Sequence, residues 1–105
     1  MHMTTVRLER PEGTPLQSGI AVQIEAASAQ DAERLDLQGA RTYDVFWIYT
    51  MEGVPDVPLR RRDLLVDERE NDPETGLPAR YRVTGLVETF AGDHQEALCE
   101  RIIGG

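Results

Sequence analysis

The sequence predicts an all-β fold, a small β-barrel or sandwich of about six short strands with one short helix. Three observations lead to this prediction. Apolar and polar residues alternate in several short segments, clusters rich in Gly, Pro, Asn and Asp separate these segments, and the chain has 105 residues, enough for one domain. Because no repeat or linker divides the chain, we expect residues 1–105 to form a single domain.

The first two strands are predicted from alternation. In residues 4–10 the apolar side chains of Val6 and Leu8 share one face, with charged residues between them. A turn-forming cluster follows at residues 11–15, and residues 19–27 then alternate in the same way. Each of these strands should therefore bury one face in the core.

A short helix is predicted after the second strand. Residues 28–35 are long enough for one or two helical turns, and Ser28 is a suitable N-cap. Asp31 lies in the first turn, where a carboxylate favours the positive end of the helix. Gly39 is expected to end this region.

The strongest strand signal lies in residues 41–51, which are rich in aromatic and β-branched side chains. Both faces are apolar, so the strand should be central and covered on each side, one cover being a neighbouring subunit if the domain assembles. We expect Trp47 to be largely buried, in the barrel or against such a neighbour. One face carries Tyr43, Val45, Trp47 and Tyr49, and the other carries Phe46 and Ile48.

Three further strands are predicted in the second half of the chain. Residues 63–70 should form a strand with Leu64 and Val66 directed inward, and residues 81–90 should form the next. A turn containing Asp-Pro-Glu-Thr-Gly separates them. Residues 96–103 alternate as a closing strand, although a short helix also fits this last segment.

The composition excludes several classes of protein. The net charge is −8 and the pI about 4.6, which argues against a surface that binds nucleic acid as a whole. The longest apolar run, residues 45–49, is far shorter than a membrane span.

The first residues have no basic region and no apolar core, so we expect no signal peptide, and residues 1–4 are expected to be flexible or derived from cloning. The single cysteine, Cys99, excludes an internal disulfide and indicates a reducing compartment.

No constellation of catalytic residues is apparent, so we predict neither an enzyme nor a bound cofactor or metal. His94 and Cys99 stand five residues apart, which places them on opposite faces of one strand and argues against a Cys–His pair. The acidic residues 67–74 lack the ligand spacing of an EF-hand loop. We interpret them as a solvated turn, with a weak cation site as the alternative.

All 11 basic residues are arginine, which pairs with carboxylates in bidentate fashion and suits interfaces. Codon usage is the alternative explanation for the absence of lysine. Arg60, Arg61 and Arg62 form the one basic cluster of the sequence. This cluster could contact phosphates, neutralise an acidic neighbour in a ring, or serve as a solvated edge that prevents aggregation.

Several segments carry a family resemblance through their order and spacing. They are Ile20-Ala21-Val22-Gln23-Ile24-Glu25, the helix that follows, Arg62-Asp63-Leu64-Leu65-Val66-Asp67-Glu68, Asp72-Pro73-Glu74-Thr75-Gly76, Tyr81-Arg82-Val83-Thr84-Gly85-Leu86-Val87-Glu88-Thr89, and His94 with Glu96, Ala97 and Arg101. From about residue 6 to residue 103 the chain resembles the head-closure, or stopper, proteins of siphophages and gene transfer agents. The sequence departs from the family at the glycine that usually precedes Asp63, where it has Arg62, so that turn is expected to differ.

The resemblance implies a structural protein of the virion neck, present in the host cytoplasm during assembly. It implies a small β-barrel that forms a ring of six copies, or alternatively twelve, below the portal and adaptor. The ring would close the DNA channel after packaging and dock the tail terminator or tail tube, while genomic DNA passes without sequence-specific binding. The alternative is an oligonucleotide-binding type of barrel that binds single-stranded nucleic acid.

Candidate interface residues follow from the ring interpretation. A head-to-tail ring needs two complementary patches on each subunit, and arginines facing carboxylates would supply them. The channel-lining loop would be residues 52–62, with Glu52 and Asp56 facing DNA, or the connection at residues 28–40. The expected subunit interface comprises Arg60, Arg61, Arg62, Asp67, Glu68, Glu70, Asp72 and Trp47.

Overall fold

The computed structural model describes residues 2–10, 15–33, 45–90 and 93–102. This part of the chain contains one helix and six strands, which confirms the predicted fold class. In chain order the elements are β1 (His2–Glu9), β2 (Pro15–Ala26), α1 (Ala29–Glu33), β3 (Val45–Thr50), β4 (Leu64–Asn71), β5 (Pro78–Phe90) and β6 (His94–Ile102). The last segment is therefore a strand and not a helix. The predicted chain break at Gly39 and the positions of Leu35 and Tyr43 lie outside the described residues.

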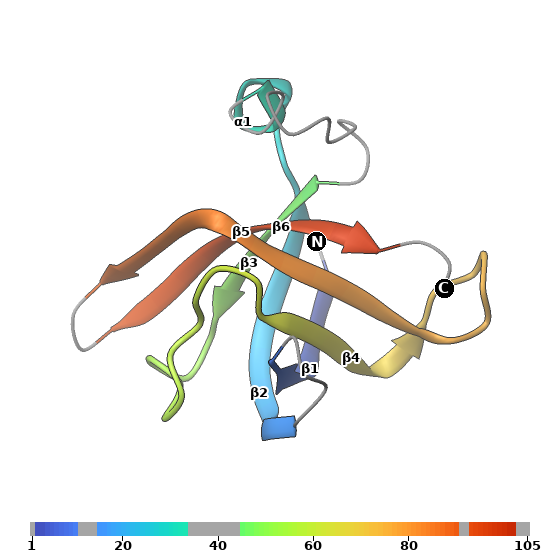
Figure 1. Ribbon diagram of the computed structural model, residues 1–105, viewed down its shortest axis with the longest axis horizontal. Coiled ribbons are helices and arrows are strands. Elements are labelled where there is room, and N and C mark those ends of the chain that lie inside the picture. Colours follow the sequence, from blue (N-terminus) through green and yellow to red (C-terminus); the bar gives the residue numbers. More distant parts are fainter. Residues whose placement is uncertain (1, 11–14, 34–44, 91–92, 103–105) are drawn as a thin grey trace.

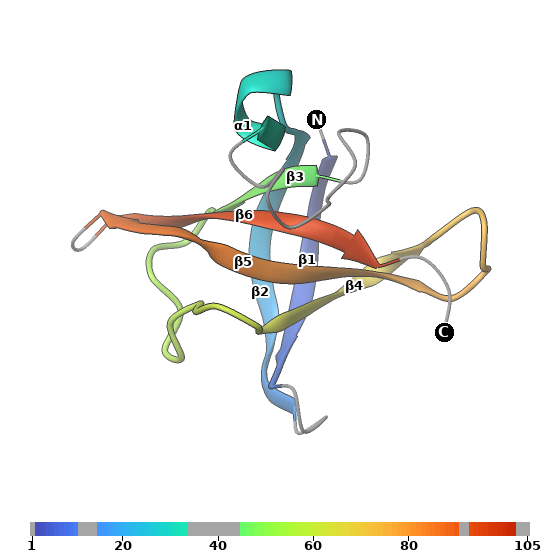
Figure 2. The ribbon, with the colours of Figure 1, turned by 45° about the horizontal axis from the view of Figure 1, so that its top comes forward.

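The six strands form one closed antiparallel barrel in the order β1-β2-β3-β6-β5-β4 (Figures 1 and 2). Pairing between β1 and β4 closes it, with Val6 opposite Asp67 and Leu8 opposite Leu65. Pairing between β3 and β6 joins the two halves, with Ile48 opposite Ala97. A closed barrel has no free edge strand, so its surface loops and outer faces remain for contact with partners.

Apolar side chains occupy the barrel interior. On the strands they are supplied by alternate residues, as the period-two pattern predicts for β1 and β2. Leu59, in the loop between β3 and β4, is 4% exposed and joins them from one end. The buried cluster is Val6, Leu8, Ile20, Val22, Ile24, Ile48, Leu59, Leu65, Ala79, Tyr81, Val83, Ala97 and Cys99.

Strand β4 faces the other way from the prediction. Leu65 belongs to the core cluster and Asp67 is 2% exposed, whereas the half-buried Leu64 lies outside the cluster, and so does Val66 although it is 5% exposed. The pairing with β1 is the reason, because residues opposite Val6 and Leu8 must share their inward face. Asp67 is thereby brought to the inner side of the barrel wall.

The outer face of β3 is also partly covered, as predicted from its two apolar faces. Val45 and Leu98 are fully buried there, with Ala27 and Trp47 packed against them. The Trp47 indole N–H donates to Asp31 Oδ2 of α1 at 2.8 Å, which ties the helix to the barrel. Trp47 is half-buried rather than largely buried, and its indole stacks beside Tyr49.

The beginning of the chain requires a correction. Residues 2–4 were expected to be flexible, but they belong to β1 and pair with residues 22–24 of β2. Thr4 is 5% exposed, and its hydroxyl donates to Asp67 Oδ1 at 2.6 Å. Strand pairing and this hydrogen bond give the residues an ordered place in the barrel wall.

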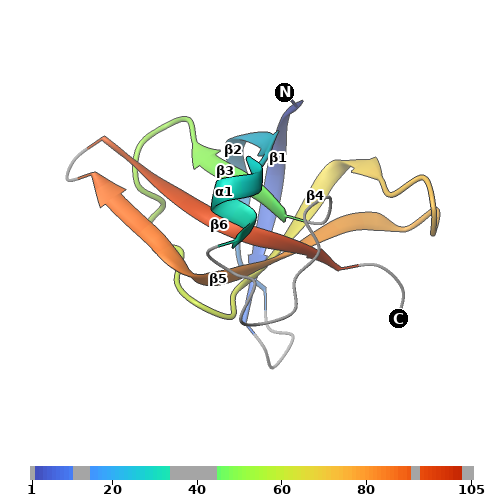
Figure 3. The same cartoon turned by 90° about the horizontal axis from the view of Figure 1, so that it is seen from above.

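Two hairpins project from the barrel on opposite sides (Figures 1 and 3). The β5–β6 register shifts between Val83 and Val87, where Thr84 donates to the Leu98 carbonyl at 2.7 Å. Beyond this irregularity the hairpin extends to Phe90, whose ring stacks on His94 at 4.7 Å. The β4–β5 hairpin ends in the predicted Asp-Pro-Glu-Thr-Gly turn.

Candidate functional site

The loop between β3 and β4 is fixed to the barrel by a buried glutamine. Gln95 Oε1 accepts the Leu59 amide at 2.7 Å, and Gln95 Nε2 donates to the Leu59 carbonyl at 3.3 Å. The same Nε2 donates to Thr89 Oγ1 at 2.9 Å, and Gln95 is 2% exposed. One side chain of β6 thus holds the loop backbone much as a neighbouring strand would.

A second anchor of this loop is Asp63, four residues after Leu59. Its Oδ2 accepts the Arg60 amide at 2.9 Å, and its own amide donates to the Arg60 carbonyl at 3.1 Å. Its Oδ1 lies 2.8 Å from Nη1 of Arg10, and both side chains are buried. The two atoms form a buried ion pair rather than an aligned hydrogen bond. These contacts shape residues 60–63 into a tight turn, which we call the arginine turn.

The backbone of the arginine turn is unusual at Arg62. Its φ is 78°, in the left-handed region that favours glycine, and no other described non-glycine residue has a positive φ. The Arg62 amide donates to the Val83 carbonyl at 2.8 Å, and the Arg62 carbonyl accepts from Arg82 at 3.4 Å. Arg62 therefore occupies a backbone conformation that glycine adopts more readily, and these two hydrogen bonds hold its backbone in place.

The side chains of Arg60, Arg61 and Arg62 are all exposed. Within the described part of the chain none of the three forms an ion pair. Three positive charges are thus held at one place on the surface with no ion-pair partner among the described residues.

Two of the four carboxylates expected to accept from these arginines, Asp67 and Asp72, are buried within the chain. Asp67 accepts from Thr4, from the ring of His2 at 2.9 Å, and from the backbone amides that follow it. Burial opposes its ionisation, but these hydrogen bonds outweigh burial and lower the pKa of Asp67. Asp72 is 3% exposed and accepts the Glu74 amide at 2.8 Å within its turn. Burial removes both from an exposed interface.

The other two expected acceptors remain at the surface. Glu68 is exposed and accepts the Gly19 amide at 2.8 Å. The side chain of Glu70 is 65% exposed and lies 3.6 Å from the ring of His2. Residues 67–71 belong to strand β4 rather than to a solvated turn, and the acidic segment 67–74 offers fewer external carboxylates than its sequence suggests.

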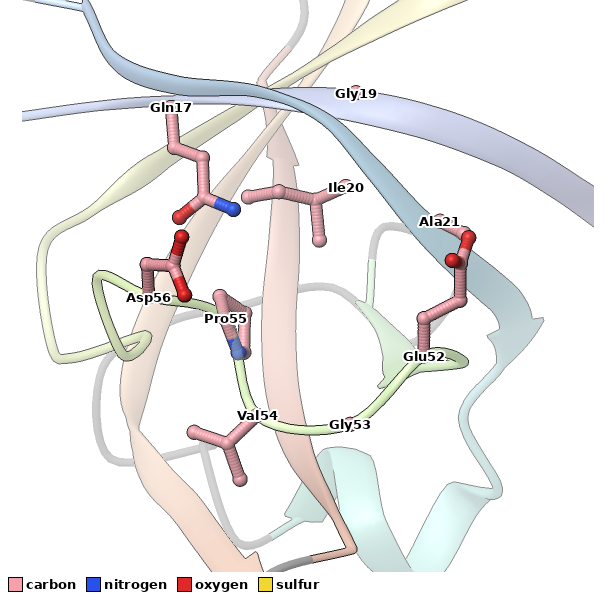
Figure 4. A pocket seen from close by; sticks show the side chains of 9 residues that line it. All are labelled: Gln17, Gly19, Ile20, Ala21, Glu52, Gly53, Val54, Pro55 and Asp56. Atoms are coloured by element: carbon pink, nitrogen blue, oxygen red, sulfur yellow. The ribbon is translucent and has the colours of Figure 1, made fainter.

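The expected channel-lining residues border a small pocket beside β2 (Figure 4). Its volume is about 220 Å³, and Val54 and Pro55 lie along the loop that borders it. Asp56 and Gln17 lie at one end and Glu52 at the other. Gln17 accepts the Val57 amide at 3.1 Å, which secures the loop to β2. Both carboxylates are exposed, so this rim of the barrel is negatively charged.

A second hollow runs over the outer face of β2 and β3, and we call it the acidic groove. Its volume is about 440 Å³. Desolvation raises the pKa of Tyr49, and the nearby charges of Glu25 and Glu96 raise it further. Trp47 stacks beside Tyr49 at 6.3 Å. The groove is lined by Gln23, Glu25, Tyr49, Thr50, Met51, Asp93 and His94.

His94 sits between two carboxylates at the edge of the acidic groove. Its Nε2 lies 2.7 Å from Glu96 and its Nδ1 lies 2.7 Å from Asp93. These two hydrogen bonds, that of Glu96 first, raise the pKa of His94. The groove is therefore a place where aromatic rings and carboxylates of the described surface come together, and no sequence pattern indicated it.

Cys99 and His94 lie on opposite faces of β6, as their spacing predicts. Cys99 is fully buried, and burial raises the pKa of its thiol. Among the residues that the structure describes, no cluster of three His, Cys, Asp or Glu side chains is arranged to hold a metal ion. No helix in the described ranges is long and apolar enough to cross a membrane.

Comparison with known proteins adds no relative. Neither protein-family models, curated proteins nor solved structures match this chain. The site must therefore be interpreted from its own geometry.

Proposed function

We propose that this protein is a structural subunit of a phage-type head–tail connector. In this role a ring of six copies, or alternatively twelve, lies below the portal and adaptor. The ring closes the DNA channel after packaging and docks the tail. The proposal follows from the resemblance of the sequence, and the backbone of one turn and the placement of the surface groups support it.

The observation that carries the proposal is the backbone of Arg62. The stopper motif has glycine before the aspartate, and here Arg62 adopts the left-handed conformation that glycine favours. The next residue, Asp63, is buried and caps this turn. A left-handed residue at the position where the stopper motif has glycine supports the resemblance, and Asp63 has a structural role in this turn.

The distribution of functional groups also supports a role in assembly. Apolar side chains occupy the barrel interior, so the groups able to recognise a partner lie on its outside. They include the arginine turn, two projecting hairpins and the acidic rim at Glu52 and Asp56. An acidic rim repels DNA phosphates and lets the duplex slide through a channel.

The alternative of a barrel that binds single-stranded nucleic acid has less support. Such proteins stack bases on exposed aromatic rings within a basic groove. Here the rings of Trp47 and Tyr49 are accompanied by Glu25, Asp31 and Glu96, which would repel phosphates.

Electron microscopy of the purified protein mixed with its cognate portal–adaptor complex tests the proposal. We expect an additional ring of density on the adaptor side away from the capsid. A complex that binds no copies under any salt condition would contradict the proposal. A strong, salt-dependent affinity for single-stranded DNA would favour the alternative instead.

A further inference from the structure

We propose that the acidic groove is the socket for the arginine turn of a second copy of this chain. The contact would be head-to-tail, with each subunit using its arginine turn on one neighbour and its groove on the other. The inference deepens the proposed function and rests on it for the idea that copies form a ring. It replaces the buried acceptors Asp67 and Asp72 with carboxylates that the structure places at the surface.

The two surfaces are formed by different parts of the barrel. The arginine turn directly precedes β4, and the groove lies over β3 and β2. In the closed order β1-β2-β3-β6-β5-β4, strands β3 and β4 are three positions apart in either direction (Figure 2). Two different, complementary patches on each copy are what a head-to-tail ring requires.

The chemistry of the groove suits arginine. A guanidinium stacks on an aromatic face and pairs with carboxylates in bidentate geometry, and the groove offers Tyr49 with Glu25 and Glu96 nearby. Glu25 also accepts from Gln23 at 2.7 Å, which holds its carboxylate in place and leaves further lone pairs. Met51 is 45% exposed at the groove and supplies apolar contact area.

The arginine turn is built to present its charges. Gln95 and Asp63 fix the loop on either side, so little ordering remains to be done on binding. Arg62 occupies a conformation in which glycine would be more favourable, and its side chain has no partner among the described residues of its own subunit. A strained residue with an unused side chain points to a role outside the subunit.

The test is a reciprocal charge swap followed by sedimentation velocity at low and high salt, about 50 and 500 mM. The turn variant carries Arg60→Glu, Arg61→Glu and Arg62→Glu, and the groove variant carries Glu25→Arg, Asp93→Arg and Glu96→Arg. Wild-type protein should self-associate at low salt and less at high salt. Each single-surface variant should associate at least about tenfold more weakly, and the variant with both swaps should recover.

Net charge makes the groove variant decisive. Each swap from carboxylate to arginine adds two charges, so three swaps bring the net charge from −8 to −2. General repulsion then predicts stronger association than wild type, whereas loss of the socket predicts weaker association. Stronger association of this variant, no recovery in the double swap, or a wild-type protein that stays monomeric would each overturn the inference.

Two controls keep the test interpretable. Circular dichroism should show the turn variant folded, because its three side chains are exposed. If the groove variant fails to fold, Asp93→Arg alone replaces it, since that side chain is 78% exposed. If the double swap does not recover association but the wild-type protein still forms ring density on the portal–adaptor complex, this interface is wrong and the proposed function stands. If the double swap recovers association but the protein does not bind the portal–adaptor complex, the interface stands and the proposed function is contradicted.

Discussion

Replacing Arg62 by glycine should make the isolated protein more stable. The left-handed conformation costs an L-residue about 1–2 kcal/mol, and glycine removes that cost. Glycine also gives the unfolded chain more freedom, which lowers the stability of the folded protein by about 0.5–1 kcal/mol. The Arg62 side chain forms no hydrogen bond or ion pair with the described residues, and the hydrogen bonds of its amide and carbonyl do not depend on it. The net gain should therefore be about 0.5–1 kcal/mol.

Thermal unfolding followed by circular dichroism measures this gain. A change of 1 kcal/mol moves the Tm of a domain of this size by about 4–8 °C, so we expect a rise of about 2–8 °C. Arg61→Gly is the matched control, because Arg61 is an exposed neighbour without a positive φ. That control should lose stability through chain entropy alone.

A third variant separates backbone strain from charge. Arg62→Ala removes the same charge but keeps a Cβ in the left-handed region, so it should not show the gain of glycine. The reasoning would be refuted if Arg62→Gly lowered the Tm as Arg61→Gly does, or if Arg62→Ala raised it equally. If the proposed interface is right, Arg62→Gly should also associate more weakly than wild type while being more stable.

Three other outcomes are expected. Gln95→Ala should cost about 1–3 kcal/mol by leaving the Leu59 amide unpaired, and trypsin should then cleave the arginine turn faster, whereas Gln23→Ala, on the outer face of β2, should not change the cleavage rate. His94 has a raised pKa in the folded state, so its contribution to stability is complete below its ordinary value of 6.5 and is lost as pH rises through the folded value. A Tm series against pH should show a wild-type advantage over His94→Gln that shrinks with rising pH, and an advantage that grows would contradict the assignment. The buried Cys99 should not react with a thiol reagent until guanidinium unfolds the protein, and fast labelling of the native state would show that its burial is wrong.

Much of the local structure was predictable because strand and turn signals are short-range. Alternation located the two strands of the first hairpin, around Val6 and Val22, and the Asp-Pro-Glu-Thr-Gly cluster located the β4–β5 turn. The two apolar faces of β3 correctly indicated a cover on each side. The spacing of His94 and Cys99 correctly placed them on opposite faces of β6.

The candidate site was predictable only in part. The exposed cluster at residues 60–62 was found, because three adjacent charges stay at the surface in almost any fold. The backbone conformation of this cluster was not predicted, because it depends on contacts with Gln95 and Arg10, which are distant in the sequence. A polar residue at an inward position of β6 was the available signal for Gln95. The acidic groove had no local signal, because β2, β3 and β6 each contribute part of it.

The sequence by itself therefore determined the strands, the turns and the charged character of the surface, all of which arise between neighbouring residues. Only the tertiary structure decided which distant strands pair, and hence which face of each strand is buried. Strand β4 illustrates the difference. Its alternation fits either face, and pairing Leu8 with Leu65 turns Asp67 inward, where Thr4 from β1 supplies a hydrogen bond. A shift of one residue exchanges the two faces of a strand, and local sequence carries too little information to decide it.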